Sequence, residues 1–228
     1  MRILFVGCVE SSYVLLQSLL EHKKEIVGVI TKKEAGLNAD YKDLSVLCLN
    51  YGIDYKYISN INDEEVIRYI REKNADIIYC FGWSQIIKKE LLEITPMGVI
   101  GFHPAALPNN RGRHPIIWAL ALGLNETAST FFKMDEGADT GDIVSQVKIP
   151  ICESDYAADL YENIMCAAKK QVLEFTENLE NGSCRTISQK KQEGNTWRKR
   201  GRKDGIIDWR MGCLLYTSDA ADDLIGVD

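Results

Sequence analysis

Short apolar runs alternate along the first half of the chain with segments whose apolar residues recur at helical spacing. Runs of four to seven residues rich in Val, Ile and aromatic residues predict buried strands. The predicted strands are Arg2–Val6, Glu25–Thr31, Asp54–Tyr57 and Asp76–Tyr79, and the predicted helices are Ser11–His22 (N-cap Ser11 or Ser12), Asp43–Asn50 and Asp63–Lys73. This alternation is typical of βαβ units. It predicts an α/β, Rossmann-like fold with a mostly parallel sheet and helices on both faces.

From Gly98 onward the pattern changes. Val99–His103 is a further predicted strand, and it leads into a loop punctuated by Pro and Gly. The elements predicted after it are a helix at Pro115–Leu122, strands at Ala128–Met134 and Ile143–Ile149, and a long helix at Ser154–Leu179. We therefore expect one domain over residues 1–181, followed by a linker and the start of a C-terminal region over 182–212.

Composition narrows the class of protein. The chain has 228 residues, 46% of them hydrophobic and 26% charged, which is typical of a globular domain. No signal peptide is recognisable, and no apolar stretch reaches the roughly 18 residues of a membrane helix, so we expect no membrane association. The seven cysteines are scattered without a C-x-x-C pair, which favours reduced thiols in a cytoplasmic protein and no metal site.

The last residues, 213–228, follow no pattern set up earlier. They hold four Asp and no basic residue, and they resemble translated sequencing-adapter read-through. We expect this tail to be non-native and the natural gene to continue beyond it. Without it the formal net charge of −6 becomes about −2.

Two segments hold candidate chemistry. His103, in the run GFHPAALPNNRG, ends a predicted strand, where open α/β sheets place their ligand crevice. A lone histidine at a strand end is often only structural, but the following Arg111-Gly112-Arg113 offers an anion site. The second segment, DEGADTGD at 135–142, lacks the spacing of a calcium loop. A carboxylate from it would orient the imidazole and favour its protonated form.

Together these segments resemble the formyltransferase family that uses 10-formyltetrahydrofolate. The resemblance rests on His-Pro-x-x-Leu-Pro-x-x-Arg-Gly, on Pro-Ile-x-Trp-Ala, and on Asp-x-Gly-Asp-Ile before Gln146, in this order. It covers about residues 1–210. It implies a catalytic pair, His103 and Asp139, and 10-formyltetrahydrofolate as cosubstrate without a metal. His103 would stabilise the oxyanion or accept the amine proton, and Asp139 would polarise the ring.

The sequence departs from the family pattern at one catalytic position. The family has Asn-x-His, whereas this chain has Gly101 two residues before His103. Loss of one oxyanion donor typically costs about 2.7–4 kcal/mol. Three readings follow: another group has taken the role, the enzyme is slower, or the chemistry is lost. Our hypothesis is that Asn109 or Asn110 supplies the missing amide.

The resemblance also implies where the folate binds. The segment after the strand at 76–79 matches the one that lines the pterin site, with Trp83 and Ile86 as an apolar wall, and backbone groups of Met134–Asp139 would read the ring. The predicted cosubstrate residues are Phe81, Gly82, Trp83, Gln85, Ile86, Met134, Asp135 and Gly137. Phe81 and Trp83 are equally well explained as core aromatics.

The motifs identify the reaction class more closely than the amine that accepts the formyl group. A tRNA acceptor would call for a basic surface and a basic C-terminal domain, and only Arg198–Lys203 is locally basic. We therefore favour a nucleotide-linked amino sugar, with Arg111, Gly112 and Arg113 as its binding residues. A methionyl-tRNA formyltransferase is one alternative. A non-catalytic binding module is another, because of Gly101. A homodimer stays open.

Overall fold

A computed structural model of the chain describes residues 1–34, 40–189 and 194–206. The tail predicted at 213–228 lies outside the described residues, as does the segment 207–212. The domain boundary expected at 181 stays a prediction. Described residues beyond it nevertheless contact the main sheet, since Ile187 forms an antiparallel bridge with Ile143.

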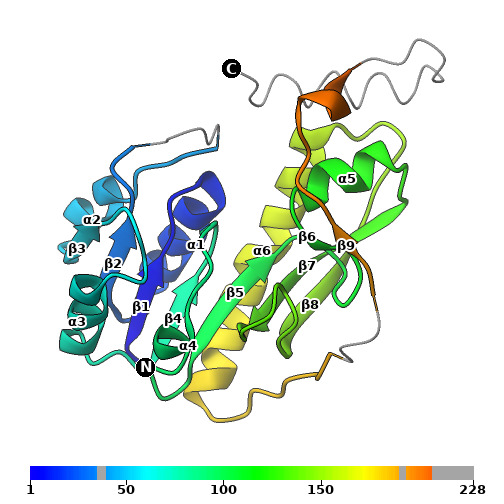
Figure 1. Cartoon of the computed structure of the whole chain (residues 1–228). Helices are drawn as coiled ribbons and strands as arrows, with labels where there is room; N and C mark the ends of the chain where they lie inside the picture. Colours follow the sequence, from blue (N-terminus) through cyan, green and yellow to red (C-terminus); the bar gives the residue numbers. More distant parts are fainter. Residues whose placement is uncertain (35–39, 190–193, 207–228) are drawn as a thin grey trace.

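A seven-stranded sheet in the order β3-β2-β1-β4-β5-β7-β8 forms the centre of the molecule (Figure 1). Its strands are β1 (Ile3–Val6), β2 (Ile26–Thr31), β3 (Tyr55–Tyr57), β4 (Ile77–Cys80), β5 (Val99–His103), β7 (Glu126–Lys133) and β8 (Ile143–Pro150). The first five are parallel, whereas β7 and β8 join as antiparallel strands. The predicted mostly parallel sheet is therefore confirmed.

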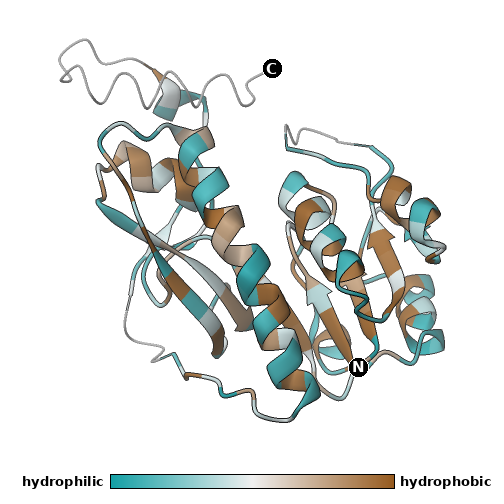
Figure 2. Cartoon of the chain, turned by 180° about the vertical axis from the view of Figure 1, so that it is seen from behind, coloured by the Kyte–Doolittle hydropathy of each residue, from teal (hydrophilic) through white to brown (hydrophobic). Residues whose placement is uncertain are grey.

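Helices cover both faces of this sheet, as predicted. One face packs against α1 (Glu10–Glu21), α2 (Ser45–Tyr51) and the 24-residue α6 (Ala157–Glu180), which Figure 2 shows in front of the strands. The other face packs against α3 (Glu64–Glu72) and the short α4 (Lys89–Leu92). Each face buries its own apolar cluster, because the β-branched strand residues alternate between the two sides.

The predicted N-cap of the first helix is wrong. Val9 occupies the cap position, and the hydroxyl of Ser12 accepts a hydrogen bond from the Val9 N–H at 3.3 Å. The same hydroxyl donates to the carbonyl oxygen of Phe81 at 2.6 Å. Ser12 thus ties the start of α1 to the end of β4, a tertiary contact that the local sequence pattern does not indicate.

Three further elements surround the candidate site. Helix α5 (Pro115–Ala121) packs on α6. Strands β6 (Arg111–Gly112) and β9 (Thr196–Trp197), which the sequence pattern did not predict, form a separate parallel pair, seen together near α5 in Figure 1. A 3-10 turn, η1 (Arg202–Gly205), follows. None of the helices in the described part of the chain has the length and apolar character needed to cross a bilayer.

Candidate active site

The two residues expected to form the catalytic pair lie side by side. His103 is the last residue of β5, and its side chain is buried. Its Nδ1 lies 3.8 Å from Oδ2 of Asp139, in the loop between β7 and β8. This separation is longer than a hydrogen bond and suits an ion pair when the imidazole is protonated. Residues 36 positions apart in the sequence therefore meet as the resemblance implies.

The other ring nitrogen of His103 is held by the backbone. Nε2 lies 2.8 Å from the carbonyl oxygen of Asn110. A carbonyl oxygen only accepts hydrogen bonds, so Nε2 must be the protonated donor. The ring thus lies between two acceptors, and only the imidazolium presents an N–H to both. This geometry fixes the orientation of the ring.

Asp139 is anchored by the loop on the other side of the pair. Its Oδ2 accepts a hydrogen bond from the N–H of Gly112 at 2.9 Å. Its carbonyl oxygen accepts from Nε of Arg111 at 3.2 Å and from Nε2 of Gln189 at 3.1 Å. Asp139 has a positive φ of 57°, unusual for a residue with a side chain. These contacts hold the carboxylate in this conformation toward His103.

The space beside Gly101 is filled by apolar side chains. Gly101 pairs with Phe132 across β5 and β7. A Cβ atom placed on Gly101 would lie 3.0 Å from both Phe132 and Met134. A side chain at this position would therefore have to displace its neighbours. The direction in which the family's Asn would point is occupied by hydrophobic atoms.

The predicted folate residues after β4 lie in different surroundings. Phe81 is fully buried among core aromatics, and Gly82 has a positive φ of 67°. Trp83 packs against the α3–α4 face, while its buried Nε1 has no hydrogen-bond partner among the described residues. Gln85 binds the loop between β3 and α3 through its amide, accepting from the N–H of Ile61 at 3.0 Å.

The remaining predicted folate residues are less uniform. Ile86 is 83% exposed, and its role as an apolar wall for the pterin stays a prediction. Met134 packs against the same apolar cluster as Trp83. The carboxylate of Asp135 accepts hydrogen bonds from the N–H of Gly137 at 3.0 Å and from the hydroxyl of Thr140 at 2.6 Å, which shapes the loop that holds Asp139.

The three residues predicted to bind the acceptor differ in their exposure and in their partners. Arg111 is buried, and its guanidinium donates to Oε1 of Gln189 at 2.8 Å in addition to Asp139. It braces the loop from inside. The N–H of Gly112 is used by the carboxylate of Asp139. Arg113 is exposed, and of the three it is the one whose side chain faces solvent.

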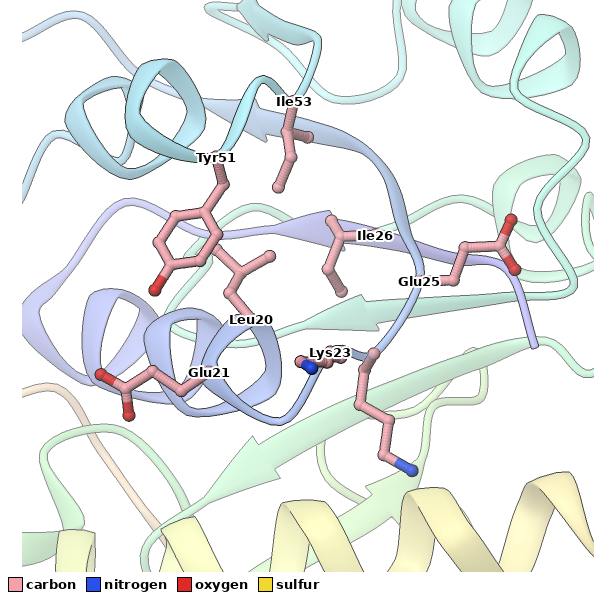
Figure 3. Close-up of a pocket in the computed structure, with 8 residues that line it drawn as sticks. Leu20, Glu21, Lys23, Glu25, Ile26, Tyr51 and Ile53 are labelled. Carbon is pink, nitrogen blue, oxygen red and sulfur yellow. The ribbon is translucent and has the colours of Figure 1, made fainter.

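A shallow hollow elsewhere on the surface is not part of this site. It is lined by the end of α1, the start of β2 and the end of α2, including Leu20, Ile26 and Tyr51 (Figure 3). Ile26 begins β2, whereas His103 ends the parallel strand β5. The hollow therefore lies at the amino ends of the parallel strands, and the candidate site lies at their carboxyl ends.

Two functional residues were missed by sequence reasoning. Gln189 bridges Arg111, Asp139 and the carbonyl oxygen of Gly141, at 2.6 Å from the last. Asn195 accepts a hydrogen bond from the N–H of Asn110 at 2.8 Å. Both lie in the polar stretch after α6, where no periodicity or motif distinguishes them. Among the described residues no group of three or more His, Cys, Asp or Glu side chains could hold a metal.

Comparison with known proteins identifies the family of the chain. The model of the formyl transferase family matches residues 1–176, which include the whole sheet and both residues of the pair. The chain belongs to this family. The prediction of a formyltransferase is thereby confirmed at the level of the family, and the predicted fold with it.

Curated relatives and solved structures differ in the acceptor that their names indicate. The chain is similar to the methionyl-tRNA formyltransferases of Agathobacter rectalis (29% identity) and Symbiobacterium thermophilum (32%), covering 92% of this chain and 69% and 65% of those proteins. In structure it resembles WlaRD, a sugar 3N-formyl transferase crystallised with dTDP and 5-N-formyl-THF. The TM-score is 0.72 at 22% identity, over 96% of this chain and 77% of that one.

A second structural neighbour is an N-formyltransferase from Helicobacter canadensis in complex with folinic acid and dTDP-3-aminofucose. Its TM-score is also 0.72, at 20% identity, over 96% of this chain and 79% of that one. At these identities the two structures establish the fold.

Proposed function

We propose that this protein transfers a formyl group from 10-formyltetrahydrofolate to the amino group of a nucleotide-linked sugar, in the cytoplasm. One observation supports the chemistry above all. His103 and Asp139, 3.8 Å apart, stand on a scaffold whose backbone fixes both, in a chain of the formyl transferase family.

The proposed chemistry needs a proton to move and a negative charge to be stabilised. When the amine attacks the formyl carbon, charge develops on the formyl oxygen and the nitrogen becomes acidic. His103 would accept the amine proton at Nδ1, because its Nε2–H donates to the Asn110 carbonyl oxygen, and Asp139 beside Nδ1 would stabilise the imidazolium that results. To stabilise the oxyanion instead, His103 would have to turn its Nε2–H away from that carbonyl. Because both residues are held before substrate binds, little reorganisation is needed at the transition state.

The residues present fit a folate cosubstrate. The buried indole Nε1 of Trp83 lacks a partner among the described residues, and a buried donor of this kind normally finds an acceptor. Pterin and formyl oxygens offer such acceptors. Two structural neighbours were crystallised with 5-N-formyl-THF or folinic acid, which supports the same class of cosubstrate here.

A nucleotide sugar is favoured as the acceptor for two reasons. The same two neighbours were crystallised with dTDP or dTDP-3-aminofucose. Without the tail expected to be non-native, the formal net charge is about −2, so the chain offers no net positive charge to a large polyanion. Exposed Arg113, which follows Gly112 in the loop that anchors Asp139, is our candidate for contact with the diphosphate.

A tRNA acceptor is the second candidate, since the curated relatives at 29% and 32% identity are methionyl-tRNA formyltransferases. The basic segment Arg198–Lys203 fits that reading, although Arg198 is paired with Asp204. A binding module without catalysis is the third, because of Gly101. The expected homodimer stays a prediction that light scattering after gel filtration can test.

An acceptor panel separates these functions. The protein is incubated with 10-formyltetrahydrofolate and, in turn, 4-amino- and 3-amino-sugar nucleotides or methionyl-tRNA, and release of tetrahydrofolate is followed. We expect turnover with one sugar nucleotide, and loss of at least about 100-fold in His103→Ala and Asp139→Ala. Turnover with methionyl-tRNA alone would overturn the sugar proposal. Folate binding without turnover with any amine would favour the binding module.

The same assay locates the oxyanion donor. Asn110 carries the carbonyl that binds His103, and its side-chain amide has no hydrogen bond among the described residues, so it stays our candidate together with exposed Asn109. We expect Asn110→Ala to lower kcat by about 100-fold, the cost of one such donor. Asn109→Ala tests the second candidate, and Asn125→Ala, at an exposed asparagine whose side chain has no hydrogen bond among the described residues, is the matched control. Unchanged kcat in both variants would exclude this hypothesis.

A further inference from the structure

The loop Asn110–Arg113, called here the site loop, fixes both residues of the pair through its backbone. The carbonyl oxygen of Asn110 binds Nε2 of His103 at 2.8 Å. Two residues later, the N–H of Gly112 binds the carboxylate of Asp139 at 2.9 Å. The positions of imidazole and carboxylate therefore depend on the conformation of the site loop.

The site loop is not self-supporting. Asn110 has a positive φ of 63°, a left-handed conformation that Asn adopts more readily than other residues with a side chain. Within the described residues, no strand of the seven-stranded sheet pairs with residues 110–113. Something outside the loop must hold it in this shape.

That support comes from residues 194–197, called here the clamp segment, which follow α6 in the chain. Oδ1 of Asn195 accepts a hydrogen bond from the N–H of Asn110 at 2.8 Å. The carbonyl oxygens of Asn195 and Trp197 each accept at 3.1 Å from the N–H groups of Arg111 and Arg113. The backbones pair as the parallel strands β6 and β9.

The contact between the two segments is close along its length. A Cβ atom on Gly194 would overlap the carbonyl oxygen of Pro108, and a Cβ atom on Gly112 would overlap the carbonyl oxygen of Trp197. Glycines on both segments thus allow the backbones to approach. The clamp segment lies beyond residue 176, where the match to the family model ends.

We propose that Asn195 is a positioning residue for His103, acting through the Asn110 peptide. Its side-chain oxygen holds the Asn110 N–H, the Asn110 carbonyl oxygen holds Nε2–H of His103, and the imidazole is thereby kept in one orientation and one tautomer. Asn195 itself is exposed, so its role is separable from core packing. The kinetic consequence of this proposal rests on the proposed function, whereas the tautomer does not.

Two substitutions separate the hydrogen bond from the backbone pairing. Asn195→Ala removes the acceptor, and Asn195→Asp keeps an oxygen acceptor of the same shape. In both variants the backbone carbonyl of residue 195 remains available to Arg111. Asn125→Ala is the matched control, because Asn125 is exposed and its side chain has no hydrogen bond among the described residues.

The decisive measurement is the histidine side-chain ¹⁵N spectrum, recorded at a pH where the rings are neutral. The chain has only three histidines, and His103→Gln assigns the signal. We expect Nε2–H alone for His103 in the wild type and in Asn195→Asp. In Asn195→Ala, the proton should be shared with Nδ1, which faces Asp139. Identical His103 signals in Asn195→Ala and the wild type would overturn the proposal.

Kinetics provide the second readout. We expect kcat to fall about tenfold in Asn195→Ala with KM for both substrates unchanged, and to stay within about twofold of wild type in Asn195→Asp and Asn125→Ala. An equal loss in the alanine and aspartate variants would contradict the proposal. If the wild type turns over no amine, the proposed function fails, while the spectra still decide the role of Asn195.

Discussion

At position 101, packing decides what chemistry the site can use. Phe132 faces Gly101 across the ladder, and Met134 lies at the same distance from the place of its missing Cβ. In central strands, glycine commonly marks such a close approach of a neighbouring side chain. Glycine at position 101 therefore fits the space that Phe132 and Met134 leave, and a larger residue such as Asn does not fit there without displacing them.

This feature predicts that restoring the family residue does not restore the family chemistry. Gly101→Asn should lower the free energy of unfolding by about 1–3 kcal/mol, because the new side chain overpacks a filled space. Its kcat should not exceed that of the wild type. Urea denaturation and the formyl-transfer assay measure the two quantities.

Gly123→Asn is the control, since Gly123 has a positive φ that Asn tolerates and no atom within 4 Å of an added Cβ. Gly101→Asn/Phe132→Leu should recover part of the lost stability by making room. A Gly101→Asn variant as stable as the wild type would show that Phe132 and Met134 yield without cost.

The residues of the site differ in how far the sequence could identify them. The pairing of His103 with Asp139 was implied by the resemblance of their two segments to the formyltransferase family. Asn195 and Gln189 were not identified, because each acts through hydrogen bonds to residues 48 or more positions away and lies in a polar stretch without periodicity. Arg111 was assigned to a substrate anion from its type alone, and the structure gives its guanidinium internal partners.

Among the elements, those with a local apolar pattern were predicted, and those that form only by pairing with a distant segment were not. Val99–His103 was predicted with the bounds that the structure shows, because a short apolar run indicates a buried strand. β6 and β9 have two residues each, and their strand geometry comes only from each other. No window of local sequence contains that information.

The pairing of β6 with β9 leads to a prediction on glycine. Gly112→Ala and Gly194→Ala should each lower the free energy of unfolding by more than about 2 kcal/mol, because strain at positive φ adds to overlap with a backbone carbonyl. Chemical denaturation measures the loss. Formyl transfer should fall with it, since the site loop loses its support.

Gly52→Ala is the matched control for backbone strain. Gly52 has a positive φ of 66°, but nothing lies within 4 Å of an added Cβ. Its substitution should cost only about 1 kcal/mol. Equal losses at Gly52, Gly112 and Gly194 would mean that the two segments are not in the close contact described here.

At the scale of the whole molecule, charges from three distant segments meet around His114. Burial lowers the pKa of His114 below its usual value of 6.5, and the nearby charges of Arg113, Lys199 and Arg200 lower it further. Asp40, after β2, opposes them in part. Burial also raises the pKa of Asp40 itself. The pKa of His114 therefore depends both on charges near the described C-terminal part, at Lys199 and Arg200, and on Asp40 in the N-terminal half.

This arrangement predicts how stability depends on pH. Well above pH 6.5, His114 is neutral in both the folded and the unfolded chain, so it contributes no pH dependence to stability. As the pH falls from 6.5 toward the lower pKa of the folded state, the unfolded chain binds a proton that the folded chain rejects. Stability should therefore decline across this window and level off below it.

The contribution of His114 is isolated by comparing the wild type with His114→Gln in urea titrations from about pH 8 to 5. The difference in unfolding free energy between the two should be constant above pH 6.5 and should shift in favour of the variant below it. Arg113→Gln removes the largest charge effect on the ring, so its pH dependence should be shallower than that of the wild type. Parallel curves for the wild type and His114→Gln would show that burial and the charges of Lys199, Arg200 and Asp40 do not shift the pKa of this ring.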